Sequence, residues 1–144
     1  MDEDDASTIA VEAAMVRIRR RQTRGALSDG AISVAVFRVL DAVADGAADT
    51  VGALAPALGV DQPRASRLVA QAVSSGLLER VADQRDGRRA VLRLTPAGRD
   101  AVATAKARRR AAMAAAMADW TPSERADFAR LLERFVDAMD QSAE

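Results

Sequence analysis

The sequence predicts a mainly α-helical fold of the α+β class, with one small β-hairpin. Apolar residues recur at helical spacing through most of the 144 residues, and glycine and proline stand where helix ends are expected. Residues 79–83 and 90–94 instead predict two short strands on either side of an arginine-rich turn. This length allows one domain, or one compact lobe with a dimerisation region.

The composition is that of a globular protein, but its charge is unevenly distributed. Nearly half of the residues are apolar, 29% are charged, and the formal net charge is zero. Residues 61–99 nevertheless hold eight arginines against four acids, whereas acidic residues gather near both ends of the chain. Basic charge concentrated in this way indicates a surface for an anionic partner such as nucleic acid.

Composition also excludes several classes of function. The chain has no cysteine and no histidine, which removes thiol redox sensing, disulfides and metal sites built from these residues, and no cofactor is expected. The serines and acids show no spacing typical of an active site, so an enzyme is not expected. The N-terminus is acidic, unlike a signal peptide, and no apolar run approaches the roughly 18 residues of a membrane span. We therefore expect a cytoplasmic protein that does not contact a membrane.

The first helix is expected from about Ser7 to Arg24. Five arginines between Arg17 and Arg24 make its C-terminal end basic. Cations there complement the helix dipole, and this interpretation is preferred over DNA contact. Its apolar residues spread over more than one face, which suits a helix packed against two neighbours or against a second chain. They are Ile9, Val11, Met15, Val16 and Ile18. Residues 27–30 break the pattern.

A second helix is expected next, and residues 44–46 end it. Its apolar stripe consists of Ile32, Val36, Val39, Leu40 and Val43. Phe37 lies off this stripe. Ordinary core packing is the preferred interpretation of Phe37, over a ligand cavity or a dimer partner.

Two short helices joined by a tight turn follow. The first is expected from about Thr50 to Leu58, and Gly59 ends it because glycine readily adopts the left-handed conformation that follows a helix. Asp61 is a suitable N-cap, and Pro63 falls in the first turn, where a missing N–H costs nothing. The second helix therefore starts almost at once.

This second helix has one apolar and one polar face. The apolar stripe consists of Ala65, Leu68, Val69, Ala72 and Val73. The polar face and its margins carry Gln62, Pro63, Arg64, Ser66, Arg67, Gln71 and Ser74. In a helix-turn-helix, the N-terminal part of the second helix enters the major groove, where arginine can bond to guanine and glutamine to adenine. The alternative is the solvated face of an ordinary amphipathic helix.

An arginine-rich hairpin comes next. Gly76 closes the preceding helix, and the turn between the two predicted strands contains Asp86 followed by Gly87. Five arginines and only two acids lie between Arg80 and Arg93. The local positive field suits a phosphate backbone or a narrow minor groove.

Two further helices complete the chain. Thr95 is an N-cap before Pro96, and an alanine-rich helix is expected from there to about Asp119. Its buried end is expected at Met113, Ala116 and Met117. Residues 121–124, Thr-Pro-Ser-Glu, form a capping box at which the last helix begins.

Five segments of the chain, in this order, carry a family resemblance. They are Leu54-Ala55-x-x-Leu58-Gly59-Val60, Ala65-Ser66-Arg67-Leu68-Val69, Gly76-Leu77-Leu78-Glu79-Arg80, Asp86-Gly87-Arg88-Arg89-Ala90 and Leu94-Thr95-Pro96-Ala97-Gly98. Each segment is weak alone, but the ordered set is specific. The chain resembles the winged helix-turn-helix of the MarR family of bacterial transcription regulators.

The resemblance implies a DNA-binding regulator, a repressor that binds a pseudo-palindromic operator as a homodimer. Arg88 is then the wing arginine expected at DNA, with Arg85 and Arg89 beside it. Asp86 is the acid expected to hold the basic side chains of the wing in place. At position 61 such proteins more often have Ser or Thr, whereas Asp61 caps equally well and brings a negative charge near phosphate.

The two ends of the chain are expected to dimerise, as residues 1–28 and 96–144, and residues 29–95 to form the DNA-binding lobe. A chain this short has little other core to cover the apolar faces of its first and last helices. The residues expected to dimerise are Val11, Met15, Ile18, Phe128, Leu131, Leu132 and Phe135.

The resemblance further implies a small aromatic ligand, because many relatives answer to small aromatic acids. A ligand wedged between the dimerisation helices and the lobe would change the spacing of the two DNA-reading helices and release DNA. Arg17 or Arg38 could pair with its carboxylate, although a structural surface role is preferred for each.

Two other classes of function, a protein-interaction module and an enzyme, fit the sequence less well than DNA binding. A winged-helix protein-interaction module without sequence-specific DNA binding would carry an acidic or apolar open face, whereas this one is basic. An enzyme with paired carboxylates could use Asp83 and Asp86. These acids flank a turn, however, and suit the wing arginines better as partners.

Overall fold

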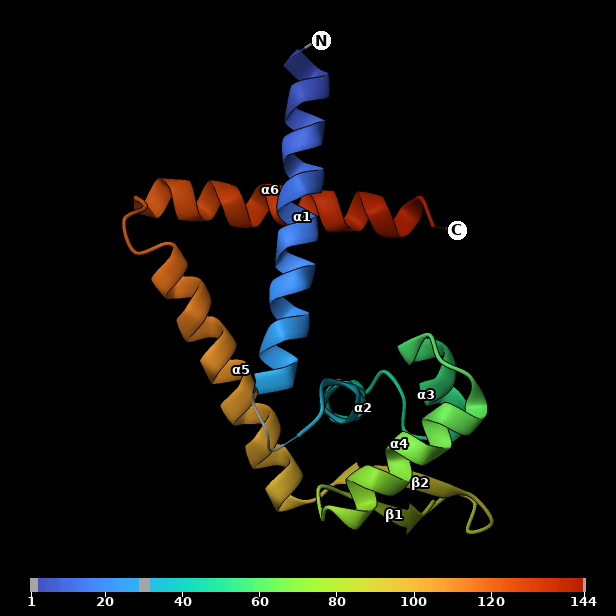
Figure 1. Cartoon of the computed structure of the whole chain (residues 1–144). Helices are drawn as coiled ribbons and strands as arrows, with labels where there is room; N and C mark the ends of the chain where they lie inside the picture. The colour runs from blue at the N-terminus through green and yellow to red at the C-terminus, as the bar shows by residue number, and fades with distance from the viewer. Residues whose placement is uncertain (1–2, 29–31, 144) are drawn as a thin grey trace. The chain divides into compact units, whose positions relative to one another are not determined.

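The computed structural model describes residues 3–28 and 32–143, which form helices and one hairpin (Figure 1). The elements are α1 (Glu3–Ser28), α2 (Val34–Ala44), α3 (Val51–Leu58), α4 (Gln62–Ser74), β1 (Leu78–Ala82), β2 (Ala90–Leu94), α5 (Pro96–Ala116) and α6 (Pro122–Gln141). The predicted mainly helical fold with a small hairpin is confirmed. The chain divides into two compact units after Val102.

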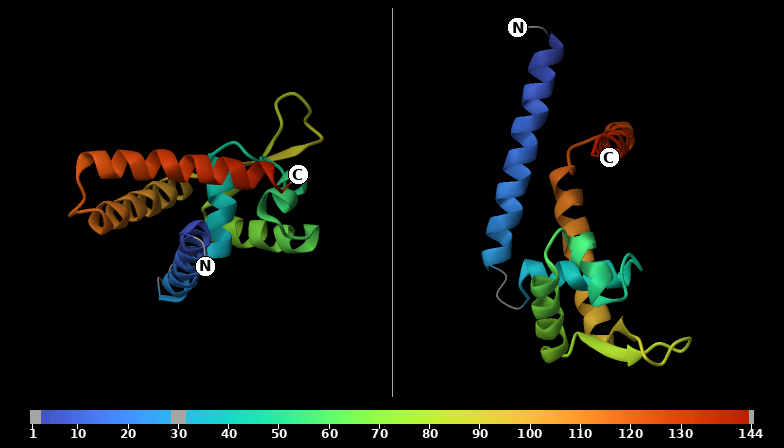
Figure 2. Two further views of the ribbon diagram at one scale, coloured as in Figure 1. Left: turned by 90° about the horizontal axis from the view of Figure 1, so that it is seen from above. Right: turned by 90° about the vertical axis from the view of Figure 1, so that its right-hand side faces the viewer.

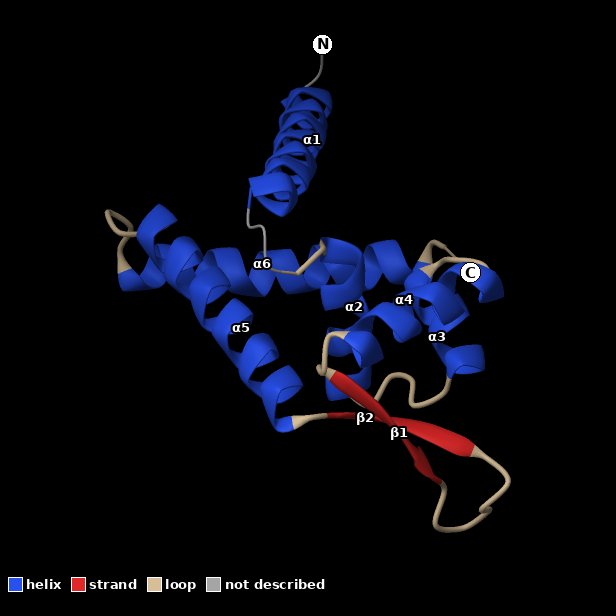
Figure 3. Ribbon diagram, turned by 60° about the horizontal axis from the view of Figure 1, so that its bottom comes forward, coloured by secondary structure: helices blue, strands red, loops and turns tan. Residues whose placement is uncertain are grey.

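The core of the first unit lies between α2, α3, α4 and the hairpin, which stand together in Figure 3. Its most deeply buried side chains come from all four of these elements. They are Val39, Leu40, Leu54, Val69 and Leu78. The apolar stripes predicted for the two helices at 34–44 and 62–74 thus converge on one centre. We call this part, residues 32–102, the winged lobe.

The turn between α3 and α4 has the predicted geometry. Gly59 adopts a φ of 67°, and its N–H donates to the carbonyl of Pro56 at 3.2 Å. The N–H of Val60 then donates to the carbonyl of Ala55 at 3.0 Å. These bonds satisfy the last carbonyls of α3, so α4 can begin two residues later.

The hairpin differs from its prediction by one residue in the first strand. The expected strand was 79–83, but β1 runs from Leu78, which pairs with Leu94, to Ala82, which pairs with Ala90. Leu78 enters the ladder because its buried side chain belongs to the core. Asp83 leaves the strand, and its carboxylate accepts a hydrogen bond from the N–H of Arg85 at 3.0 Å.

Both long helical ends differ in length from their predictions. α1 begins at Glu3 rather than Ser7, and acidic residues in its first turn suit the positive end of the helix dipole. It continues to Ser28 rather than Arg24, so Leu27 and Ser28 of the predicted break are helical, and Asp29 and Gly30 lie outside the described residues. α5 ends at Ala116 rather than Asp119, and the chain continues in turns, in which the N–H of Ala118 donates to the carbonyl of Ala115 at 3.2 Å.

The helices α1 and α6 are each uninterrupted, as the two further views show (Figure 2). The capping box predicted for α6 is present, with Thr121 and Glu124 bonding to each other's backbone N–H. None of the helices in the described part of the chain is long and apolar enough to cross a membrane.

The first turns of α5 are fixed to the winged lobe. The hydroxyl of Thr95 accepts a hydrogen bond from the N–H of Gly98 at 3.0 Å and donates to the carbonyl of Gly76 at 2.6 Å. Gly98 is buried, and a β-carbon added there would overlap the backbone carbonyl of Leu77. Val102 reaches the core one turn later.

This contact gives a stability prediction. Gly98→Ala is expected to lower the free energy of unfolding by about 1–3 kcal/mol, because backbone rather than a flexible side chain must move. Gly52→Ala is the matched control, since nothing lies within 4 Å of its added carbon. The control should raise stability by up to about 1 kcal/mol. Urea unfolding followed by circular dichroism tests the pair, and equal shifts in both variants would contradict the prediction.

Candidate nucleic-acid interface

The recognition helix, as we call α4, buries one face and leaves the other in solvent. Its buried residues are Ala65, Leu68, Val69 and Ala72. Every residue predicted to read DNA from this helix is exposed, namely Gln62, Pro63, Arg64, Ser66, Arg67 and Gln71. The 3.6-residue repeat explains this division, because residues three and four apart share a face.

The N-terminal end of the recognition helix is capped as predicted. The Asp61 carboxylate accepts a hydrogen bond from the N–H of Arg64 at 2.8 Å. The guanidinium groups of Arg64 and Arg67 have no ion pair within the described part of the chain. Two arginines one turn apart therefore remain available on the open face.

The hairpin tip is ordered through its backbone. The carboxylate of Asp86 accepts from the N–H of Arg88 at 3.1 Å, and its carbonyl accepts from the N–H of Arg89 at 3.0 Å. The carboxylate of Asp83 bonds in the same way to Arg85. Both acids thus shape the loop through N–H groups, and the side chains of Arg85, Arg88 and Arg89 remain exposed.

Asp49 contributes to the wing without having been expected from the sequence. Its carbonyl accepts a hydrogen bond from the N–H of Leu92 at 2.6 Å, and its carboxylate lies 3.9 Å from the guanidinium of Arg89. Asp49 and Arg89 are 40 residues apart, so no local pattern could have joined them. The segment before α3 therefore braces β2 from its free edge.

A second pair stiffens the base of the hairpin. Glu79 and Arg93 are opposite each other in the register, and their charged groups lie 2.8 Å apart. The Nε of Arg93 also donates to the same carboxylate at 2.9 Å. This arginine is engaged within the hairpin, in contrast to the arginines at the tip.

The recognition helix and the hairpin tip face the same side of the winged lobe. In Figure 1 the first turns of α4 and the loop between β1 and β2 both lie toward the right-hand side. The loop extends beyond the helices of the lobe, as Figure 3 shows. A rod-like anionic partner could therefore touch both.

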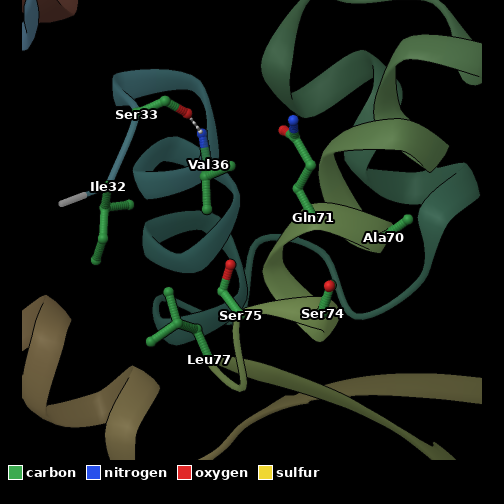
Figure 4. Close-up of a pocket in the computed structure, with 8 residues that line it drawn as sticks. All are labelled: Ile32, Ser33, Val36, Ala70, Gln71, Ser74, Ser75 and Leu77. Carbon is green, nitrogen blue, oxygen red and sulfur yellow. Dashed lines mark hydrogen bonds between the residues drawn. The ribbon is translucent and has the colours of Figure 1, made fainter. Parts of the chain in front are cut away.

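A hollow of about 520 Å³ lies between α2 and the recognition helix (Figure 4). It is lined by Ile32, Ser33, Val36, Ala70, Gln71, Ser74, Ser75 and Leu77. The described lining is apolar or uncharged, and the hydroxyl of Ser33 is occupied as the acceptor for the N–H of Val36 at 3.2 Å. Gln71 belongs both to this lining and to the predicted DNA-reading face.

The structure decides between the interpretations offered for two residues of α2. Phe37 is partly buried against the core, which confirms the preferred interpretation of core packing. Arg38 donates from Nη2 to the carbonyl of Leu58 at 3.2 Å and so ties α2 to the end of α3. A structural role thus accounts for Arg38.

The residues predicted to dimerise are exposed on their own helices. On α1, Val11, Met15 and Ile18 are 40–51% exposed. On α6, the predicted face is 37–48% exposed at Phe128, Leu131, Leu132 and Phe135. Phe128 has one ring contact, an edge-to-face arrangement with Trp120 at 5.3 Å between centroids. The expectation of a buried end of α5 is wrong for the single chain, where the side chain of Met113 is 60% exposed, Ala116 is exposed and Met117 is half-buried.

Comparison with known proteins agrees with this geometry. Residues 32–89 match the sequence model described as the MarR family. No curated protein matches the sequence.

Solved structures resemble the chain over most of its length. A MarR family protein from Bacillus stearothermophilus has a TM-score of 0.81 at 20% identity and covers 97% of this chain and 99% of its own. A mutant of MarR from E. coli has a TM-score of 0.69 at 25% identity, covering 88% and 95%. BpsR of Bordetella bronchiseptica, whose DNA binding is regulated by 6-hydroxynicotinic acid, has a TM-score of 0.62 at 24% identity, covering 88% and 93%.

Proposed function

We propose that this chain, whose residues 32–89 match the MarR family model, is a winged-helix regulator of that family that represses transcription by binding a pseudo-palindromic DNA operator as a homodimer. The observation that carries this proposal is the recognition helix, whose buried apolar stripe leaves Arg64 and Arg67 exposed on the opposite face. Residues 29–95 form the DNA-binding part in this proposal, and residues 1–28 and 96–144 form the dimer.

The recognition helix enters the major groove in the proposed complex. Arginine can bond to the O6 and N7 atoms of guanine, and glutamine to adenine, so Arg64, Arg67 and Gln71 are suited to base contacts. Gln62, Pro63 and Ser66 lie at the margins of the same face, where contacts to sugar and phosphate fix the register.

The wing contacts the adjacent minor groove or its phosphates through Arg85, Arg88 and Arg89. Cations attract strongly there because the narrow groove concentrates the negative potential. Asp86 supports this role through the loop backbone, since its bond to the N–H of Arg88 fixes where that side chain starts.

The homodimer is supported by the apolar faces of α1 and α6. Exposed aromatic and aliphatic side chains in one row are more typical of a subunit interface than of a solvated helix. A two-fold axis would place two recognition helices about 34 Å apart, one turn of the DNA helix, as a pseudo-palindrome requires.

We expect a measurable loss of DNA affinity when the wing loses a charge. Arg88→Ala should weaken binding several-fold at physiological salt and reduce the slope of log K against log salt by about 2, because each of the two wings of the dimer loses one cation. Asp86→Ala should weaken binding without changing that slope, because it removes no cation. Fluorescence anisotropy with duplex DNA from upstream of the chain's own gene measures both.

Arg130→Ala on α6 is the matched control, as its guanidinium pairs with Asp127 at 3.6 Å. It changes the net charge equally and should leave affinity and slope nearly unchanged. Binding by the unmodified chain that is absent or insensitive to salt would instead favour a winged-helix protein-interaction module.

The dimer makes a separate prediction. Leu132→Glu places a charge in the apolar face of α6 and should shift the chain from dimer to monomer, weakening operator binding by at least about tenfold. Ala126→Glu introduces the same charge on the opposite side of α6 and is exposed. Sedimentation velocity should show a dimer for the control. Dimerisation that survives Leu132→Glu unchanged would contradict this interface.

Regulation by a small molecule completes the proposal. The hollow between α2 and the recognition helix supports a ligand site, because an occupant would touch Gln71 and the packing that orients α4. A ligand releases DNA only if it favours the helix spacing that cannot bind DNA, since equal affinity for both states shifts nothing.

Small aromatic acids, including 6-hydroxynicotinic acid, are the compounds to screen by thermal shift. A ligand at 100 times its dissociation constant should stabilise the chain by about 2.7 kcal/mol and lower its affinity for DNA. Ser74→Leu narrows the hollow and should reduce the shift. An equal rise in melting temperature for Ser74→Leu and the unmodified chain would exclude this hollow as the binding site. If no compound raised the melting temperature of the unmodified chain, aromatic acids would be ruled against as regulators.

A further inference from the structure

Among the N-caps that the structure describes, the cap of α4 differs in chemistry from the others. Each of the helices α2, α3, α5 and α6 begins with a residue whose hydroxyl accepts a hydrogen bond from a backbone N–H at 3.0–3.2 Å. These residues are Ser33, Thr50, Thr95 and Thr121. Among the helices whose N-cap lies in the described residues, α4 alone begins with an acid, Asp61. This is also the helix proposed to enter the DNA groove.

Capping occupies only part of the Asp61 carboxylate. Its Oδ1 accepts the N–H of Arg64 at 2.8 Å. A carboxylate offers two oxygens with about four lone-pair positions, and the second oxygen of Asp61 has no hydrogen-bond partner in the described part of the chain. The residue is exposed and directly precedes Gln62 and Pro63, at the leading end of the recognition helix.

A carboxylate at this position is electrostatically unfavourable next to DNA unless it meets a donor. Charges repel appreciably within the Debye length of about 8 Å at physiological salt, and serine would cap the helix without this cost. In the major groove the donors on base edges are the amino groups of cytosine and adenine, whereas guanine and thymine present acceptors. Adenine also places its N7 acceptor beside the amino group, which disfavours a carboxylate.

We infer that Asp61 is a base-selecting residue, whose second carboxylate oxygen accepts a hydrogen bond from the N4 amino group of a cytosine in each half-site. The inference rests on the proposed DNA binding and extends it from affinity to sequence preference. Arg64 and Arg67 favour guanine, so Asp61 would add selection for cytosine at a neighbouring base pair.

The experiment is selection from a random-sequence duplex DNA pool with the full-length chain and two variants. The unmodified chain should enrich cytosine at one position in each half-site. Asp61→Ser keeps an N-cap but removes the acceptor, so discrimination there should fall roughly 5- to 150-fold while other positions keep their preference. Its affinity for the whole pool should rise, because a negative charge has gone.

Asp61→Asn separates base selection from charge. The asparagine side chain has nearly the same shape as aspartate, and its amide oxygen can still cap the helix. Its amino group would then present a hydrogen-bond donor to the groove. Preference at that position should therefore move to guanine or thymine, which present acceptors. Asp100→Asn, an exposed acid on α5, is the matched control and should leave the enriched sequence unchanged.

The possible results separate the two levels of the proposal. Unchanged preference at every position in both Asp61 variants would overturn the selecting role and leave DNA binding intact. Identical profiles for Ser and Asn at position 61 would also overturn it, since charge alone would then explain the effect. A failure of the unmodified chain to enrich any sequence would overturn the proposed function and this inference with it. Melting temperatures near that of the unmodified chain should show that both variants fold.

Discussion

The packing of α4 against the lobe is the constraint on which the rest of the structure depends. One stripe of four small or branched apolar residues is buried among α2, α3 and the hairpin. Because this stripe fixes the rotation of the helix about its axis, it also fixes which side chains face outward. The positions of Arg64 and Arg67 thus follow from the burial of Leu68 and Val69, and no contact of the arginines themselves is needed.

The hairpin tip is held in shape while most of its positive charge remains exposed. Asp83 and Asp86 bond to backbone N–H groups, so they hold the loop while leaving guanidinium groups exposed. At the base of the hairpin Glu79 and Arg93 do pair directly. The pair at the base is close, at 2.8 Å, whereas the tip is held mainly through its backbone and Arg89 lies 3.9 Å from the carboxylate of Asp49.

Local signals in the sequence predicted most of the fold. Helix starts at Thr50, Asp61 and Thr121 were predictable because capping depends on residues within one turn. The first strand was displaced by one residue because its start depends on the pairing of Leu78 with Leu94 across the hairpin, which only the tertiary structure reveals.

Contacts between distant residues could not be predicted from one sequence. The bonds from Asp49 to Leu92 and Arg89, and from Arg38 to Leu58, join segments that no periodicity connects. The hollow beside Gln71 could not be predicted either, because it depends on how α2 and α4 pack against each other. For the candidate interface, therefore, the sequence predicted which residues are exposed, and the structure added what holds them in place.

The exposure of the last helix bears on the proposed dimer. α6 has 20 residues and strong start signals, yet none of its described side chains is buried. Most helical stability in proteins comes from packing of an apolar face rather than from intrinsic propensity. The alanine-rich α5 offers little area for that purpose, since alanine buries few atoms. Folding of these ends and pairing of two chains would then be one equilibrium, so the fraction of chains that present two recognition helices together would depend on protein concentration as well as on any ligand.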